Sequence, residues 1–108
     1  MKPADKRMKV ECGIDVTLVT FNDIQILGEQ QINELRDMLI PVIEKDEGKK
    51  LVLNFANVQF MSSAFLGLLI RVHKKVCEQG GQLQLCNLDP RIHKIFEITR
   101  LTQVFDIS

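Results

Sequence analysis

The chain has 108 residues, of which 45% are hydrophobic and 26% are charged, a composition typical of one globular domain. Fourteen basic residues balance fourteen acidic ones, and the zero net charge argues against general nucleic-acid binding and against electrostatic docking on an anionic membrane. No apolar run approaches the roughly 20 residues that span a bilayer, and no signal-like segment follows the charged start, so we expect a cytoplasmic protein without membrane insertion.

The start of the domain predicts a β-hairpin. Residues 1–7 are predicted to be a flexible N-terminal lead-in, and residues 8–108 a single domain. Residues 8–12 alternate apolar and polar side chains, and residues 16–21 are β-branched and aromatic, so both segments predict strands. The short turn between them predicts that the two strands pair antiparallel.

A long helix is expected next. Residues 24–28 show no period and predict a loop. From Glu29 onward a helix would carry five apolar residues on one face: Ile32, Leu35, Leu39, Val42 and Ile43. Pro41 predicts a kink or a restart, because proline removes a backbone hydrogen bond. Residues 46–50 predict the end of the helix and a turn.

A second strand–helix pair follows. Residues 51–55 are almost all apolar, which predicts a central parallel strand that is buried on both faces. Residues 56–61 would connect this strand to a helix over residues 63–79, which Gly80 and Gly81 end. Four apolar residues share the centre of its inner face: Phe65, Leu69, Val72 and Val76.

The last part of the chain predicts a strand, a helix and a final strand. Residues 82–86 alternate as a strand does. Asp89 is a good N-cap and Pro90 suits the first helical position. The third helix would turn four residues to the core: Ile92, Ile95, Phe96 and Thr99. Residues 104–107 predict the last strand.

This order of elements indicates an α/β fold, because strands that alternate with helices pair in parallel through right-handed crossovers. We expect a single domain with a mostly parallel or mixed sheet of about five strands, flanked by three or four helices. Ser62 and Ser63 would lie at the carboxyl edge of the sheet, where such folds bind ligands and partners. Each hydroxyl there could cap the second helix or be a target for modification.

The residues around the serines do not favour an enzyme. No G-x-S-x-G is present, and neither Asp89, His73 nor His93 stands at a spacing that supports a catalytic triad. A serine hydrolase is therefore a minor alternative. No glycine-rich phosphate loop is present either, so no cofactor is predicted.

The three cysteines, Cys12, Cys77 and Cys86, form neither a disulfide framework nor a zinc spacing, and we expect them to be small core residues. His73 and Cys77 stand four apart on one helical face, and Cys86 could approach them from the adjacent strand. Two ligands do not make a metal site, so the prediction is that His73 and Cys77 pack at the margin of the core and that no metal binds.

The run Leu51-Val52-Leu53-Asn54-Phe55-Ala56-Asn57-Val58-Gln59-Phe60-Met61-Ser62-Ser63-Ala64-Phe65-Leu66-Gly67 resembles the signature of the STAS domain. Further matches are Glu78-Gln79-Gly80-Gly81-Gln82-Leu83, Asp89-Pro90 and Phe96-Glu97-Ile98-Thr99-Arg100-Leu101. The resemblance covers about residues 8–107 and implies the fold described above. This chain departs from the family pattern at Ser62, where an aspartate is usual, and at Phe65, where a glycine is usual.

The family includes bacterial anti-sigma factor antagonists, and the resemblance implies that function here. In such antagonists the serine at the position of Ser63 is phosphorylated by a partner that is both serine kinase and anti-sigma factor, and a phosphatase resets the cycle. Ser62 is the alternative modified residue. The implied partner surface comprises six residues: Met61, Ser62, Ser63, Ala64, Gly28 and Glu29. The chain would be a monomer or weak dimer. The alternative is an unswitched STAS scaffold in a signalling or lipid-transport assembly.

Overall fold

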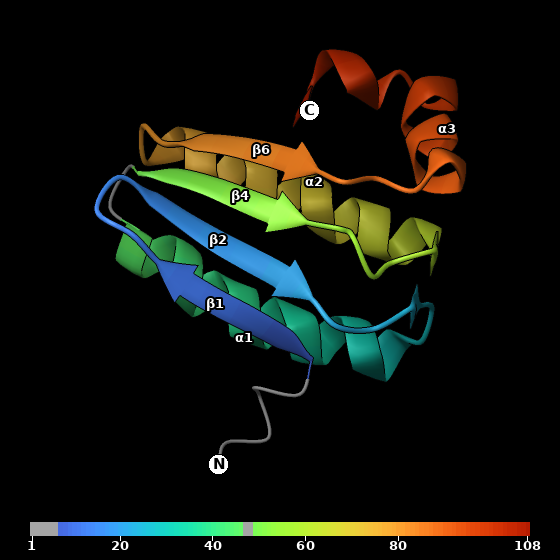
Figure 1. Cartoon of the computed structure of the whole chain (residues 1–108), viewed down its shortest axis with the longest axis horizontal. Coiled ribbons are helices and arrows are strands. Elements are labelled where there is room, and N and C mark those ends of the chain that lie inside the picture. The colour runs from blue at the N-terminus through green and yellow to red at the C-terminus, as the bar shows by residue number, and fades with distance from the viewer. Residues whose placement is uncertain (1–6, 47–48) are drawn as a thin grey trace.

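A computed structural model describes residues 7–46 and 49–108 of the chain (Figure 1). Its elements, in chain order, are β1 (Met8–Cys12), β2 (Val16–Phe21), β3 (Gln25–Ile26), α1 (Glu29–Asp46), β4 (Lys50–Asn54), β5 (Phe60–Met61), α2 (Ser63–Glu78), β6 (Gln82–Cys86), α3 (Pro90–Ile98), the 3-10 turn η2 (Leu101–Gln103) and β7 (Asp106–Ile107). The predicted lead-in and the predicted turn after α1 lie partly outside the described residues. Of the lead-in only Arg7 is described. No helix of the described chain is long and apolar enough to cross a membrane.

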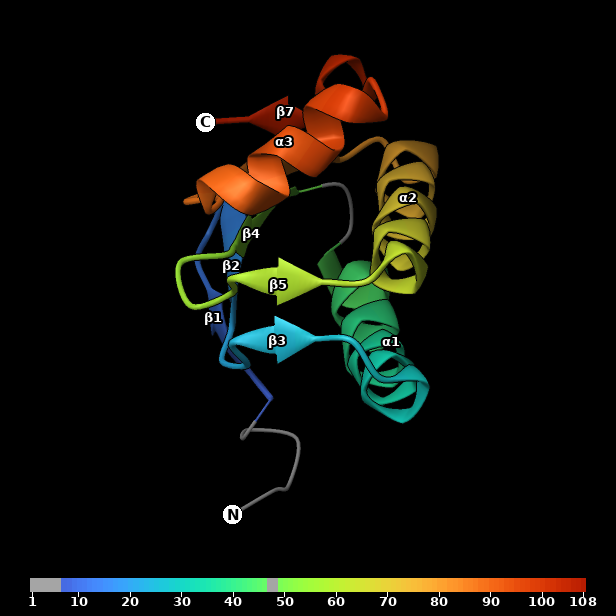
Figure 2. The same cartoon turned by 90° about the vertical axis from the view of Figure 1, so that its right-hand side faces the viewer.

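Five strands form the main sheet in the order β1-β2-β4-β6-β7. β1 and β2 pair antiparallel as predicted, and the other neighbours pair in parallel. α1 and α2 cover the same face of this sheet, and α3 lies at the carboxyl end of its strands (Figures 1 and 2). The predicted α/β architecture is confirmed, with β4 in the centre.

The prediction that β4 is buried on both faces is wrong. Leu51 and Leu53 are fully buried beneath the helices, whereas Val52 between them is only partly buried. Both crossover helices pack on one side, so the side chains of the other face lie open. A run of apolar residues in β4 therefore does not require a second covering layer.

A second sheet of two strands was missed by the sequence analysis. β3 and β5 pair in parallel, with Gln25 opposite Phe60 and Ile26 opposite Met61. Both strands lie beyond the carboxyl ends of β2 and β4 (Figure 2). Two-residue strands are too short to show an alternating pattern. Residues 24–28 were therefore predicted as a loop and residues 56–61 as a connection.

Helix α1 continues through Pro41, so the predicted restart is wrong. Pro41 lies on the exposed side of the helix. Water can therefore bind the carbonyl group of Asp37, which lacks the amide partner that any other residue would supply. Of the predicted inner face, Val42 is only partly buried and the other four residues are buried.

The later helices begin where the sequence predicts. Asp89 caps α3, and its Oδ1 accepts a hydrogen bond from the Arg91 amide at 2.9 Å. The expectation that Thr99 faces the core is wrong, because Thr99 is exposed at the end of α3 and its hydroxyl donates to the Ile95 carbonyl oxygen at 2.7 Å. The last strand is shorter than predicted, since residues 104 and 105 form a turn and a bend between η2 and β7.

Three phenylalanines form an aromatic cluster in the core below the start of α2. The ring centroids of Phe21 and Phe65 lie 5.6 Å apart with the rings nearly perpendicular, and the ring of Phe55 lies 5.2 Å from Phe21 and 6.3 Å from Phe65. All three side chains are fully buried. The cluster joins the end of β2, the residue that follows β4 and the first turn of α2, and so it fixes that turn against the sheet.

Candidate functional site

Ser62 is the N-cap of α2. Its backbone is extended, with φ −89° and ψ 165°, and its Oγ accepts a hydrogen bond from the Phe65 amide at 3.4 Å. Its own amide donates to the Ile26 carbonyl oxygen at 2.9 Å. Both the backbone and the side chain of Ser62 are therefore engaged, and the capping role that the sequence left open belongs to this serine.

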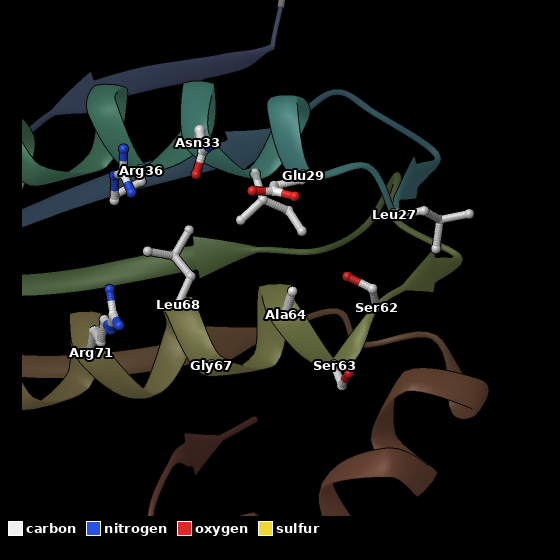
Figure 3. Close-up of a pocket in the computed structure, with 11 residues that line it drawn as sticks. Leu27, Glu29, Asn33, Arg36, Ser62, Ser63, Ala64, Gly67, Leu68 and Arg71 are labelled. Carbon is white, nitrogen blue, oxygen red and sulfur yellow. The ribbon is translucent and has the colours of Figure 1, made fainter.

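Ser63 is the first residue of α2, and its side chain is exposed. In the part of the chain that the structure describes, no hydrogen bond involves the Ser63 hydroxyl. Figure 3 shows the two hydroxyl groups pointing in different directions, that of Ser62 toward α1 and that of Ser63 away from it. Two adjacent serines thus have different roles, one structural and one presented to solvent.

The remaining residues of the predicted partner surface differ in exposure. Ala64, Gly28 and Glu29 are exposed, whereas Met61 is 8% exposed and belongs to the core. Glu29 is the first residue of α1 and Gly28 precedes it. Figure 3 shows Glu29 beside the start of α2. Five of the six residues, those other than Met61, therefore reach the surface near one another.

The loop before α1 is held by the side chain of Gln31. Its Oε1 accepts from the amides of Leu27 and Gly28 at 3.1 and 3.4 Å. Its Nε2 donates to Asp23 Oδ2 at 3.0 Å, and Arg7 Nη1 donates to the same oxygen at 3.0 Å. The hydrogen bond with Asp23 raises the pKa of Arg7. This network was not predicted, because its members form no sequence motif and Arg7 joins it from the far side of the hairpin.

A groove of about 450 Å³ runs between α1 and α2 from this loop. Ser62 and Glu29 lie at its outer end, and Arg36 and Arg71 lie further along it (Figure 3). Eleven residues line the groove: Leu27, Glu29, Ile32, Asn33, Arg36, Ser62, Ser63, Ala64, Gly67, Leu68 and Arg71. The exposed serine therefore borders a concave surface that a partner could fill.

A smaller cavity of about 290 Å³ lies on the other side of the serine segment, between β5 and α3. Phe60 and Leu27 line it and remain 41% and 51% exposed, and the Arg91 guanidinium carbon sits 4.9 Å above the centre of the Phe60 ring. Exposed apolar side chains beside a cleft are typical of a protein-binding surface. The sequence did not reveal this patch, because β5 was read as a connection.

The expectation that all three cysteines are core residues is wrong for two of them. Cys12 and Cys77 are exposed, and Cys86 is half-buried, which raises the pKa of the Cys86 thiol. Cys12 is on an edge strand, and Cys77 is on the outer side of α2 near its end. The side-chain Nδ2 of Asn87 donates to the Sγ of Cys86 at 3.8 Å. Among the described residues no three histidine, cysteine or acidic side chains form a group that could hold a metal ion.

Replacing Ser62 with alanine should lower the free energy of unfolding by about 1 kcal/mol, the usual loss for an N-cap. The matched control is Ser63→Ala, for which a change within about 0.5 kcal/mol is expected, because the hydroxyl lies at the surface and no described residue forms a hydrogen bond with it. Urea denaturation of both variants measures the difference. Equal stability of the two variants would contradict the capping assignment.

Comparison with known proteins gives one consistent family. The model of the STAS domain matches residues 13–108. An anti-sigma-B factor antagonist of Bacillus subtilis (strain 168) is 39% identical over 92 residues, which cover 81% of this chain and 83% of that protein.

Solved structures share the fold. A crystal structure of an anti-sigma factor antagonist from Thermotoga maritima superposes with a TM-score of 0.83 at 17% identity, covering 96% of this chain and 87% of that one. The Bacillus cell fate determinant SpoIIAA in its phosphorylated form superposes with a TM-score of 0.71 at 17% identity, covering 94% and 90%.

Proposed function

The chain belongs to the STAS domain family, and we propose that it acts as a cytoplasmic anti-sigma factor antagonist. In this proposal its partner is an anti-sigma factor with serine kinase activity, and phosphorylation of Ser63 ends the binding until a phosphatase removes the phosphate. The relative from Bacillus subtilis supports the antagonist role, since it carries that name at 39% identity.

The observation that carries the switch is the different environment of the two serines. Ser63 offers an exposed hydroxyl at the surface, whereas the Ser62 hydroxyl is turned inward to accept from the Phe65 amide. A kinase must reach the oxygen that it modifies, and the Ser62 hydroxyl is half-buried and already accepts from the Phe65 amide. Ser63 is therefore the modified residue in our proposal.

A phosphate on Ser63 would sit at the N-terminus of a 16-residue helix. The helix dipole favours an anion at this end by about 0.3–1 kcal/mol, and the phosphate adds about −1.5 to −2 charges at pH 7. No acidic residue occupies the first turn of α2, and the N-cap before it is Ser62, where the family pattern has an aspartate. The modified chain should therefore keep its fold, and the modification would act on the partner through charge and bulk.

The surroundings of Ser63 support its role as a substrate rather than as a nucleophile. His73 lies ten residues further along α2, about 15 Å at the helical rise, and His93 Nδ1 is 3.2 Å from Glu97 Oε1 on α3. Neither imidazole is placed by these contacts to take the proton of Ser63. We therefore assign no catalytic role to this chain.

Incubation with ATP and the anti-sigma factors of the same organism tests the site directly. We expect peptide mass spectrometry to find one phosphate on Ser63 in the wild type and in Ser62→Ala, and none in Ser63→Ala. A phosphate that persists in Ser63→Ala would overturn the assignment of the site. Absence of both phosphorylation and binding with every such factor would overturn the antagonist role itself.

A further inference from the structure

Strand β1 lies at one edge of the main sheet, with β2 on its inner side (Figure 1). Within the described residues no strand pairs with its outer edge. Four of its five residues are exposed, and only Met8 is buried. A free strand edge presents a row of backbone donors and acceptors, to which a further strand can be added.

The hydrogen bonds of the hairpin show which backbone groups point outward. The Asn22 amide donates to the Arg7 carbonyl oxygen at 2.9 Å, and the Gly13 amide donates to the Val16 carbonyl oxygen at 2.7 Å. Hydrogen-bonded positions recur at every second residue of an antiparallel strand, so the odd-numbered residues of β1 bond to β2. The even-numbered residues therefore turn their amides and carbonyls to the free edge: Met8, Val10 and Cys12.

Two opposite charges stand on the face of β1 that the helices leave uncovered. Lys9 and Glu11 pair with Thr20 and Leu18, which alternate with the buried residues of β2 and carry no charge. Neither Lys9 nor Glu11 forms an ion pair with a described residue. Their charges are therefore available to a strand that pairs with the free edge.

A second copy of the chain fits this edge in one register. When two β1 strands pair antiparallel about a two-fold axis at Val10, the residues that exchange hydrogen bonds are those with outward backbone groups. The same register sets Lys9 opposite Glu11 of the second copy, at the positions where side chains come closest. The two adjacent registers would set Lys9 opposite Lys9, or Glu11 opposite Glu11, and like charges directly opposite each other are destabilising.

We propose that the chain forms a symmetric dimer through antiparallel pairing of β1 with β1 of a second copy, centred on Val10. Val10 is 39% exposed and would pack against Val10 of the second copy. Five residues a side bury less surface than the ~1,200 Å² of stable complexes, so the dissociation constant should lie in the micromolar-to-millimolar range. The dimer does not depend on the antagonist role, since no residue of β1 lines the groove beside Ser63.

Sedimentation velocity of the reduced chain at low ionic strength, at concentrations from micromolar to millimolar, tests the dimer. We expect Lys9→Glu and Glu11→Lys each to weaken self-association by at least about tenfold, because each sets like charges opposite each other. The double variant with both substitutions restores opposite charges and should dimerise within about threefold of the wild type. An equimolar mixture of the two single variants should form heterodimers, since every glutamate then faces a lysine.

Two further variants control for net charge and for the backbone contacts. Lys74→Glu changes the net charge equally on the exposed side of α2 and should leave self-association unchanged. Val10→Pro removes an amide that faces the free edge, so it should abolish the dimer without loss of a bond to β2, and circular dichroism checks that it folds. A wild type that stays monomeric at millimolar concentration overturns the proposal. A dimer that survives Val10→Pro, or that the two single charge variants do not weaken, lies at another surface and overturns it equally.

Discussion

Ser63→Glu is expected to weaken binding of the anti-sigma factor by at least about a hundredfold, equivalent to about 2.7 kcal/mol. The substituted carboxylate imitates the charge of a phosphate at the first position of α2. Docking of a partner against this exposed position would bury the charge or bring it near a like charge, which costs several kcal/mol. The fold should tolerate the change, since a negative charge is favourable at a helix N-terminus. Calorimetric titration with the anti-sigma factor measures the loss.

Ser63→Gln separates charge from size. Glutamine has the shape of glutamate without its charge. If charge causes the loss of binding, the affinity of Ser63→Gln for the anti-sigma factor should be closer to that of the wild type than to that of Ser63→Glu. Binding by Ser63→Glu within about threefold of the wild type would remove the basis of the switch.

The largest effect on stability is expected from Phe65→Ala, at about 3–5 kcal/mol. Phe65 is fully buried and contacts both other rings of the aromatic cluster. Truncation would leave a cavity and would also remove the edge-to-face contact with Phe21 and the tilted contact with Phe55, and such ring pairs are worth about 0.5–1.5 kcal/mol each. Urea denaturation measures the loss.

Phe60→Ala is the matched control. Phe60 is 41% exposed on β5 and stacks with Arg91. Phe60→Ala should therefore lower the free energy of unfolding by much less than Phe65→Ala does. A loss below about 1 kcal/mol for Phe65→Ala would mean that the cluster is not the support of α2, because burial of a phenylalanine alone is worth more than that.

Much of the fold could be predicted because its main elements are long and regular. The alternation in residues 82–86 and the inner face of α2 reflect burial on one side of an element, and sequence records this directly. In residues 8–12 the same alternation located a strand, but only Met8 of that strand is buried. The failures follow from tertiary context. The pairing of β3 with β5 depends on residues 35 apart in the chain, and the exposure of Cys77 depends on where α2 ends relative to the sheet.

The sequence located the candidate site but could not assign the separate roles of its two serines. Ser62 and Ser63 both suited a helix start, and only the backbone angles and the amide contact of Ser62 distinguish cap from exposed hydroxyl. The hydrogen bonds of the Gln31 side chain and the cavity beside Arg91 could not be predicted, since neither leaves a periodic or spaced pattern in the sequence.

The separation of roles between Ser62 and Ser63 has a consequence for how such proteins diverge. When a single residue carries both folding stability and signalling, a change that alters one alters the other, and selection on either trait restricts both. Here the amide of Phe65 is satisfied by Ser62, so position 63 can vary without loss of the helix start. Duplicated copies of this chain could therefore acquire new partners, or lose regulation altogether, through substitutions at position 63 that purifying selection on stability would not remove.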